Sequence, residues 1–128
     1  MDSSPTPLAL LCLMESFLSV SHNNRIQVFE CSSGRYVRKF GSYGNADGCL
    51  SYPWGVCVHR DLVFVSEETG HRVSVFSRDG QFIRKWGSQG SSSGQFSNPR
   101  GICVSSDGYV FIADHNNHRI QVFANLIK

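Results

Sequence analysis

Short hydrophobic runs recur along the chain, and most of them alternate with polar residues in the manner of β-strands. In the middle of the chain the runs are Gly55 to Val58, Leu62 to Ser66, His71 to Phe76 and Gln81 to Trp86. The connections between them are short, which favours an antiparallel meander. After Val20 no helical period competes with this pattern. The pattern therefore predicts an all-β fold.

The first hydrophobic run, Leu8 to Met14, is less regular than the later ones. With the residues that follow, it suits either two strands or a short helix. A bilayer-spanning helix needs about 20 apolar residues, and a signal peptide needs Lys or Arg ahead of its apolar core. The run meets neither requirement. We interpret it as part of the fold and predict no membrane span, with a cryptic signal peptide as the alternative.

Two positions of the pattern return at a constant spacing of 47 residues. They are an arginine (Arg25, Arg72 and Arg119) and a phenylalanine (Phe29, Phe76 and Phe123). Other positions, such as Pro53 and Pro99, return after 46 residues, because turn lengths differ between the copies. Repeats of this length that contain four short strands are typical of β-propeller blades.

The repeat also resembles a known family. The resemblance lies in DGQFIRKWGSQG (residues 79–90), in a P-x-G-[IV] strand start, in a D-G turn and in FIADHNNHRIQVF (residues 111–123). These segments are similar to the NHL repeat of six-bladed propellers, over roughly residues 17 to 123. NHL propellers occur in tripartite-motif ubiquitin ligases, in translational repressors that bind RNA, in bacterial receptor ectodomains and in an amidating lyase. The resemblance thus implies a fold and leaves several functions open.

The predicted architecture is a partial β-propeller of four-stranded antiparallel NHL-type blades, about two and a half blades of a six-bladed ring. Residues 1–7 form a loose N-terminus, 8–41 an incomplete first blade, 42–87 a complete second blade, and 88–128 a third blade truncated at its outer strand. Exposed blade faces favour association. We therefore expect further blades from a longer chain or from a second copy.

A carboxylate lies five residues before the repeat arginine in two copies, as Glu67 with Arg72 and as Asp114 with Arg119. Each acid ends one strand near the start of the next, so the pair can hold the turn through a bidentate ion pair. Because the pattern repeats, we interpret it as a structural staple. Ser21 takes the place of the acid in the first copy, so the first blade is expected to be the weaker one.

Two histidines, His115 and His118, follow Asp114 closely enough to be mistaken for metal ligands. Only one of them recurs in the second copy, as His71, and the residues between them are typical of a turn. We predict no metal and no cofactor. No spacing assembles a catalytic triad either, so we predict no catalytic residue.

The copies disagree just before the innermost strand, where Tyr52 and Trp54 of the second copy become Asn98 and Arg100 in the third. Loop side chains vary without disturbing blade packing, so binding specificity is expected here. Trp54 can stack on a nucleobase or fill a peptide pocket, and Arg100 can pair with phosphate or carboxylate. We predict these four residues as a binding rim. Resemblance to tripartite-motif NHL proteins implies RNA at this rim, and the alternative is that Trp54 caps the blade interface.

Several basic residues are predicted on and beside the outermost strands. Edge strands commonly carry Lys and Arg, which prevent strand addition, so a solvated edge is the first interpretation and a basic binding surface the second. The set is Arg35, Arg38, Lys39, Arg84 and Lys85.

Composition adds two constraints. A net charge of +2 is too small to indicate nucleic-acid binding by itself. The five cysteines are odd in number and lack C-x-x-C spacing, which argues against a disulfide framework and favours a reducing, cytoplasmic setting. Cys57 and Cys103 occupy equivalent positions, at which we expect buried side chains.

The sequence thus favours a non-enzymatic binding module that recognises a protein or a single-stranded RNA, as in ubiquitin-ligase or post-transcriptional NHL proteins. Ligase chemistry needs a zinc-binding RING with paired Cys and His, and this chain has no such pattern. The alternatives are a fragment of an amidating-lyase type of enzyme and a structural repeat remnant without activity.

Overall fold

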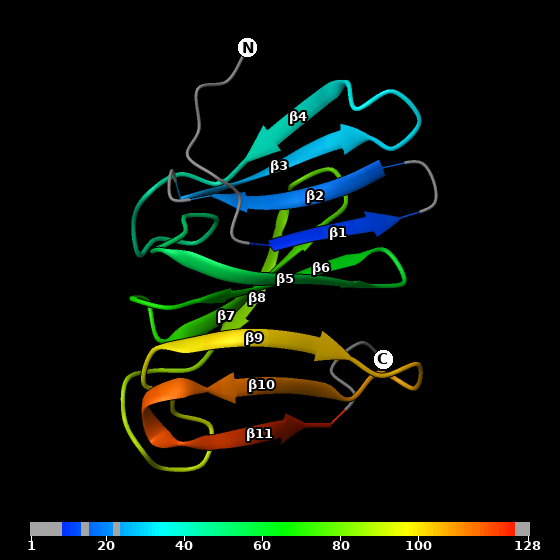
Figure 1. Ribbon diagram of the computed structural model, residues 1–128. Helices are drawn as coiled ribbons and strands as arrows, with labels where there is room; N and C mark the ends of the chain where they lie inside the picture. The colour runs from blue at the N-terminus through cyan, green and yellow to red at the C-terminus, as the bar shows by residue number, and fades with distance from the viewer. Residues whose placement is uncertain (1–8, 14–15, 22–23, 125–128) are drawn as a thin grey trace.

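The computed structural model describes residues 9–13, 16–21 and 24–124, with side chains from residue 24 onward. The predicted loose terminus, residues 1–7, lies outside the described residues. The described part forms eleven strands and one three-residue 3-10 helix, arranged in three antiparallel sheets that follow one another from top to bottom in Figure 1. The all-β prediction is confirmed. No helix in the described residues is long and apolar enough to cross a bilayer.

The first sheet pairs its strands in chain order: β1 (Ala9–Leu13), β2 (Ser16–Ser21), β3 (Arg25–Glu30) and β4 (Tyr36–Phe40). The ambiguous first run therefore forms a hairpin of two strands, not a helix. This sheet has as many strands as the second one, whereas the sequence predicted an incomplete first blade. Strand pairing depends on backbone hydrogen bonds and on side chains that alternate between the two faces. A strand can therefore form even where few residues of the repeat motif remain.

The second sheet contains β5 (Pro53–His59), β6 (Leu62–Glu67), β7 (Arg72–Ser77) and β8 (Phe82–Trp86), again in chain order. Its register shifts between Val75 and Phe76, and the first sheet shifts at the equivalent pair, Val28 and Phe29. A bulge at the same repeat position shows that the copies share backbone detail as well as strand order.

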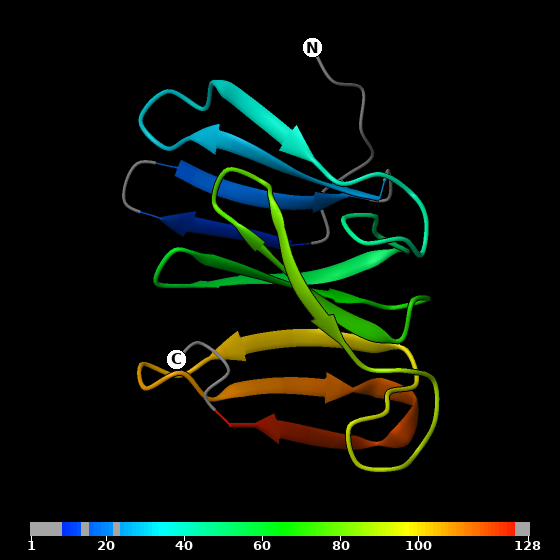
Figure 2. The ribbon, with the colours of Figure 1, turned by 180° about the vertical axis from the view of Figure 1, so that it is seen from behind.

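The third sheet has three strands, β9 (Pro99–Val104), β10 (Val110–Asp114) and β11 (Arg119–Phe123), with the 3-10 helix η1 (His115–Asn117) between the last two. The loop that enters the third sheet, residues 87–98, lies beside that sheet (Figure 2). The loop that enters the second sheet, residues 41–52, is bonded to that sheet through Arg72. Each loop contains a parallel bridge at the same repeat position, Tyr43 with Leu50 and Gln89 with Phe96.

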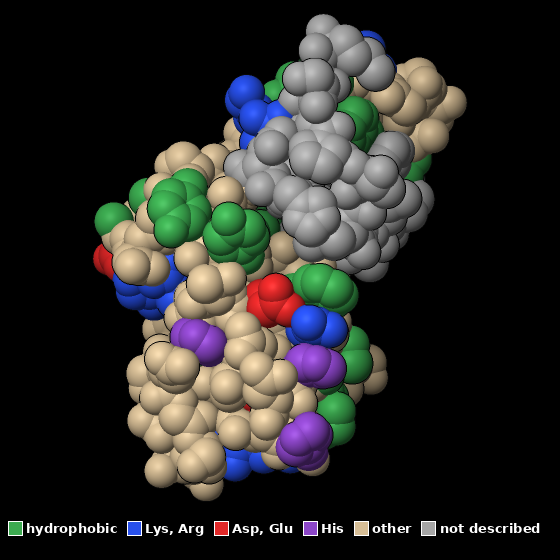
Figure 3. All heavy atoms as spheres, turned by 60° about the vertical axis from the view of Figure 1, so that its left-hand side comes forward, with side chains coloured by type: hydrophobic (Ala, Val, Ile, Leu, Met, Phe, Trp, Pro, Cys, Tyr) green, Lys and Arg blue, Asp and Glu red, His purple; other side chains and the backbone are tan. Residues whose placement is uncertain are grey.

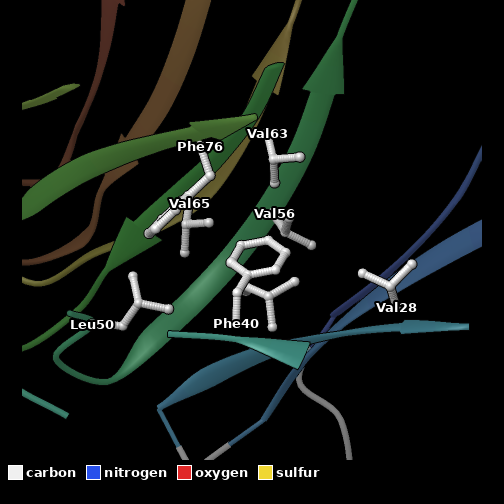
Figure 4. Packing of buried hydrophobic residues seen from close by; sticks show 8 residues of the cluster. Val28, Phe40, Leu50, Val56, Val63, Val65 and Phe76 are labelled. Atoms are coloured by element: carbon white, nitrogen blue, oxygen red, sulfur yellow. The ribbon is translucent and has the colours of Figure 1, made fainter. Parts of the chain in front are cut away.

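A hydrophobic core lies between the first and second sheets (Figure 4). The rings of Phe40 and Phe76 meet across this boundary with their centroids 5.0 Å apart. Gly80 allows this approach, because a Cβ there would lie 2.8 Å from Phe40. The buried members of the core are Ile26, Val28, Phe40, Leu50, Val56, Val63, Val65 and Phe76.

A second core lies between the second and third sheets, and the far face of the third sheet is open in the described part of the chain. Val73 and Val75 on β7 are 0% and 1% exposed, whereas the equivalent Ile120 and Val122 on β11 are 62% and 54% exposed. The buried members of this core are Cys57, Phe64, Val73, Val75, Phe96, Val110 and Ile112.

The two equivalent cysteines show the same contrast. Cys57 is buried, and burial, with a smaller contribution from Cys103, raises the pKa of its thiol to about 12. Cys103 is exposed, so the expectation of a buried side chain is wrong at that position. The physical reason is that no element of the described residues packs on the outer face of the third sheet.

Candidate functional site

Glu67 and Arg72 form a buried ion pair at the turn between β6 and β7. The Nε of Arg72 lies 2.9 Å from both carboxylate oxygens of Glu67, and the carboxylate also accepts the N–H of Ser51 at 2.9 Å and the hydroxyl of Ser74 at 2.5 Å. Arg72 Nη2 also lies 2.9 Å from Glu67 Oε1, so two guanidinium nitrogens face the acid. The two outer nitrogens of the guanidinium donate to the carbonyls of Gly44, Asn45 and Cys49 in the entering loop.

Asp114 and Arg119 repeat this arrangement in the third sheet. Asp114 Oδ1 accepts the N–H of Ser97 at 2.7 Å, and Oδ2 accepts Arg119 Nε at 2.9 Å. Burial alone would raise the pKa of Asp114, but the hydrogen bonds from Ser97, Asn117 and Arg119 outweigh it and lower that pKa. Arg119 donates its outer nitrogens to the carbonyls of Ser91, Ser92 and Gln95.

Both pairs therefore connect a strand turn to the loop that enters the same sheet. The bond from the carboxylate reaches Ser51 in one sheet and Ser97 in the other, and the next residues are Tyr52 and Asn98. In the first copy β2 ends at Ser21 beside Arg25, and the side chain of Ser21 lies outside the described residues. The acid–arginine pairs thus hold the chain immediately before the predicted binding residues.

Trp54 and Arg100 lie inside β5 and β9, at the second residue of each strand, and not in the preceding loops as the sequence suggested. The strands begin at Pro53 and Pro99, one residue before Trp54 and Arg100. Proline is tolerated as the first residue of a strand, where its missing N–H costs no hydrogen bond between strands. The guanidinium carbon of Arg100 lies 4.5 Å above the centre of the Trp54 ring. The two residues therefore form one cation–π pair across the sheet boundary.

Glu68 is the third member of this cluster. Its Oε2 accepts Arg100 Nε at 2.6 Å, and the side chains of Arg100 and Glu68 are 37% and 22% exposed. In the described residues, the side chain of Arg100 is held by two contacts, the Trp54 ring and the Glu68 carboxylate. Both leave the outer two guanidinium nitrogens accessible. The cluster therefore presents the planar guanidinium of Arg100, with two free N–H donors, next to the aromatic ring of Trp54.

Tyr52 and Asn98 both have a left-handed backbone, with φ of 54° and 55°. The N–H of Tyr52 donates to Asn24 Oδ1 at 2.8 Å, and the N–H of Asn98 donates to His71 Nδ1 at 3.0 Å. Each residue thus links its own sheet to the preceding one. The Tyr52 ring also meets that of Tyr43 edge to face, with centroids 6.2 Å apart, and both rings are exposed.

We use the term "rim" for this group of residues: Tyr43, Tyr52, Trp54, Glu68, Asn98 and Arg100. Figure 3 shows the side of the molecule on which β5 and β9 begin. Hydrophobic side chains gather over one part of this face, and acidic, basic and histidine side chains lie close to one another over another part.

Comparison with known proteins adds the family to this geometry. A sequence profile described as NHL repeat matches residues 50–76 and 96–123. These ranges coincide with β5 to β7 and with β9 to β11. These two segments match the NHL repeat.

The relatives also define how much of a propeller is present. Protein lin-41 of Caenorhabditis elegans is 46% identical over 44 residues, which are 34% of this chain and 4% of lin-41. The WD40 β-propeller domain of Doa1 superposes with a TM-score of 0.68 at 11% identity, over 93% of this chain and 36% of that one. The computationally designed protein Ika8 superposes with a TM-score of 0.62 at 15% identity, over 90% and 32%. The chain is thus a partial β-propeller that spans a minor part of each of these proteins.

The basic residues predicted from the sequence lie on and beside exposed sheet edges. Arg38 and Lys39 are on β4, Arg84 and Lys85 are on β8, and these strands are the outermost of their sheets. Lys85 pairs with Asp47 at 3.1 Å. Arg35, just before β4, lies 3.3 Å from Glu30, whose pKa is lowered by hydrogen bonds from Ser33 and from Arg35. Lys85 Nζ also donates to the carbonyl of Asn45 at 3.0 Å, in the loop that carries Tyr43 of the rim.

The two histidines that follow Asp114 lie in the turn between β10 and β11, and the absence of a metal there stays a prediction. The described residues contain no group of three His, Cys, Asp or Glu side chains that could hold a metal ion. His115 belongs to η1, and His118 follows it with a left-handed backbone, φ 53°.

Sequence reasoning missed two members of the rim, Glu68 and Tyr43, and it missed His71, which accepts the N–H of the rim residue Asn98. A signal for them was present in the repeat. Equivalent positions of successive copies become neighbours when blades stack, so Trp54 and Arg100 should have been expected to touch. Glu68 follows the acid of the staple directly, and it could have been recognised as a partner for a cation on the next copy.

Proposed function

We propose that this NHL chain is a non-enzymatic binding module whose rim recognises a protein partner. The observation that carries the proposal is Arg100, which is stacked on Trp54 and anchored to Glu68 while its outer nitrogens remain free. Arg and Trp are the residue types that dominate binding energy at protein interfaces. The exposed pair Tyr43 and Tyr52 adds apolar contact area at low entropic cost.

Charge at the rim supports a protein over RNA. Glu68 lies 2.6 Å from Arg100, so a phosphate that approached the guanidinium would also approach a carboxylate. A protein surface with an acidic and an apolar side chain close together fits this mixture of charges better than a uniformly negative backbone does. Single-stranded RNA is the second candidate, because a cation–aromatic stack also offers a platform for a base.

The rest of the propeller forms part of the proposal. The exposed Ile120 and Val122 occupy positions that are buried in the second sheet, which supports a further blade or a second copy on that face. A role in a larger ubiquitin-ligase or post-transcriptional NHL protein follows from the family resemblance. The cytoplasmic setting inferred from the cysteines belongs to the same proposal.

The test uses the full chain and a random peptide library displayed on phage. Selected peptides are measured by calorimetry against the wild type, Trp54→Ala and Arg100→Ala. We expect each variant to weaken binding about tenfold or more. Arg84→Ala, which changes an exposed arginine on β8, is the matched control and should leave affinity unchanged.

A uridine oligonucleotide serves as the competing probe. If the oligonucleotide binds, loses affinity steeply with salt and depends on Arg100, RNA is the partner class and the protein proposal is wrong. If neither probe distinguishes Arg100→Ala from Arg84→Ala, the rim is not the recognition surface. In that case the amidating-lyase fragment and the inactive repeat remnant are the alternatives to pursue.

A further inference from the structure

A residue with a left-handed backbone precedes the repeat arginine in every copy. It is Asn24, His71 or His118, with φ of 60°, 53° and 53°. The first two accept an N–H from the following sheet: Asn24 Oδ1 from Tyr52, and His71 Nδ1 from Asn98. The same hydrogen bond is thus built twice, once at each sheet boundary.

The two bonds differ in how their acceptors respond to protons. The amide oxygen of Asn24 accepts at any ordinary pH. The Nδ1 of His71 accepts only while the imidazole is neutral, because a protonated imidazole carries a hydrogen on both nitrogens. After protonation, the N–H of Asn98 would face another N–H group. The link between the second and third sheets is therefore available only to the neutral ring.

Asn98 connects this link to the rim. Its side-chain Nδ2 donates to the backbone carbonyl of Glu68 at 3.3 Å, and its Oδ1 accepts from Asn116 at 2.5 Å. Two residues further along, Arg100 pairs with the carboxylate of the same Glu68. His71 and Glu68 belong to one turn, so this turn holds both Asn98 and Arg100.

We propose that His71 is a positioning residue for the rim, and that its protonation uncouples the Asn98–Arg100 segment from the second sheet. The coupling is a property of the fold. Its effect on a ligand rests on the proposed function, so the two are measured separately.

The charged and titratable groups around His71 come from three elements. Its own turn carries Glu67, Glu68 and Arg72. Across the boundary it bonds Asn98, which lies two residues before Arg100 and also bonds Asn116, the neighbour of His115 in η1. Both acids already have a cation, since Glu67 pairs with Arg72 and Glu68 pairs with Arg100. In the described part of the chain, neither of these two carboxylates is therefore left without a cation to pair with a protonated His71. Histidine is the side chain whose charge ordinarily changes between about pH 5 and 8, so a modest acidification is the relevant perturbation.

The test is amide hydrogen exchange by NMR on the full chain, expressed as protection relative to the intrinsic rate at each pH. Between about pH 7.5 and 5.5 the protection of the Asn98 amide should fall about fivefold or more, the size expected for one lost hydrogen bond. The Tyr52 amide, bonded to Asn24, is the internal control and should keep its protection.

Two variants separate titration from a merely structural role. His71→Asn installs the acceptor that the first copy uses, in a residue type that tolerates a left-handed backbone, so Asn98 should stay protected at both pH values. His71→Gly fits the backbone without an acceptor, and Asn98 should lose protection at both.

The proposal is overturned if Asn98 keeps its protection in the acidified wild type. It is equally overturned if Asn98 loses protection in His71→Asn to the same extent as in the wild type. The affinity of the selected peptides is then measured at the same pH values. If no peptide binds at either pH, the proposed function fails, while the amide data still decide the role of His71.

Discussion

Replacing Arg72 with alanine tests how much the acid–arginine pair contributes to stability. The side chain of Arg72 is 8% exposed, and that of Glu67 is fully buried. In Arg72→Ala the carboxylate keeps its bonds from Ser51 and Ser74 but loses its counter-charge. Three loop carbonyls lose their donor as well. An uncompensated buried charge is among the costliest defects that a point substitution creates.

The magnitude follows from burial. Removing one partner of a buried ion pair costs about 3–5 kcal/mol. The loop carbonyls lie near solvent, where water can replace the guanidinium, so we add nothing for them. The pair of Arg119 with Asp114 is the matched comparison, because the arginine there is 31% exposed. Solvent screening reduces the expected cost of Arg119→Ala to about 1–2 kcal/mol.

The assay is urea unfolding followed by tryptophan fluorescence, with both variants measured beside the wild type. A domain of ordinary stability has about 5–15 kcal/mol in total, so Arg72→Ala will be close to the limit of folding. Arg72→Lys keeps the charge without the planar fork and should cost less than alanine. A loss below about 1 kcal/mol in Arg72→Ala would contradict the reasoning. So would a greater loss in Arg119→Ala than in Arg72→Ala.

Two further predictions concern Asp114 and a pair of equivalent glycines. The pKa of Asp114 is lowered in the folded state, so its contribution is fully present above the unfolded value of about 4 and is lost as pH falls through the folded value. Denaturant titrations should show stability falling below about pH 4 in the wild type and a flatter profile in Asp114→Asn. A Cβ on Gly55 would lie 2.7 Å from the carbonyl oxygen of Arg100, whereas one on Gly101 meets only Ala113 at 3.8 Å. Gly55→Ala should therefore cost about 1–3 kcal/mol and Gly101→Ala almost nothing, and equal melting temperatures would refute the close packing of β5 on β9.

The strands and the acid–arginine pairs were predictable because both depend on local periodicity. An alternating run forms a strand whatever covers it, and an acid five residues before an arginine closes the turn between two adjacent strands. The sequence therefore indicated Glu67 with Arg72 and Asp114 with Arg119. The first hairpin was ambiguous, because the run Leu8 to Met14 lacks clear alternation and tertiary pairing decided the outcome.

The contacts between sheets were not predictable in the same way. Nothing within a single repeat indicates that the ring of His71 accepts from Asn98. The approach of Arg100 to Trp54 could be expected only from the stacking of equivalent positions in successive repeats. These contacts depend on how successive sheets stack, which a list of strands does not specify. The prediction that Cys103 is buried was wrong for a related reason. Its position in the repeat predicts burial, but burial also needs a neighbouring sheet.

The repeat separates scaffold from function by what stays constant at each sheet boundary. Both boundaries use a left-handed acceptor and a left-handed donor, so the hydrogen bond itself belongs to the scaffold. What changes is the acceptor, from the amide of Asn24 to the imidazole of His71, and the residue two positions after the donor, from Trp54 to Arg100. A scaffold that only needed stability could keep one acceptor throughout, because asparagine already satisfies the geometry. The boundary with the titratable acceptor is also the one that carries the accessible arginine, and this coincidence directs experiments to His71 and Arg100 before any other residues.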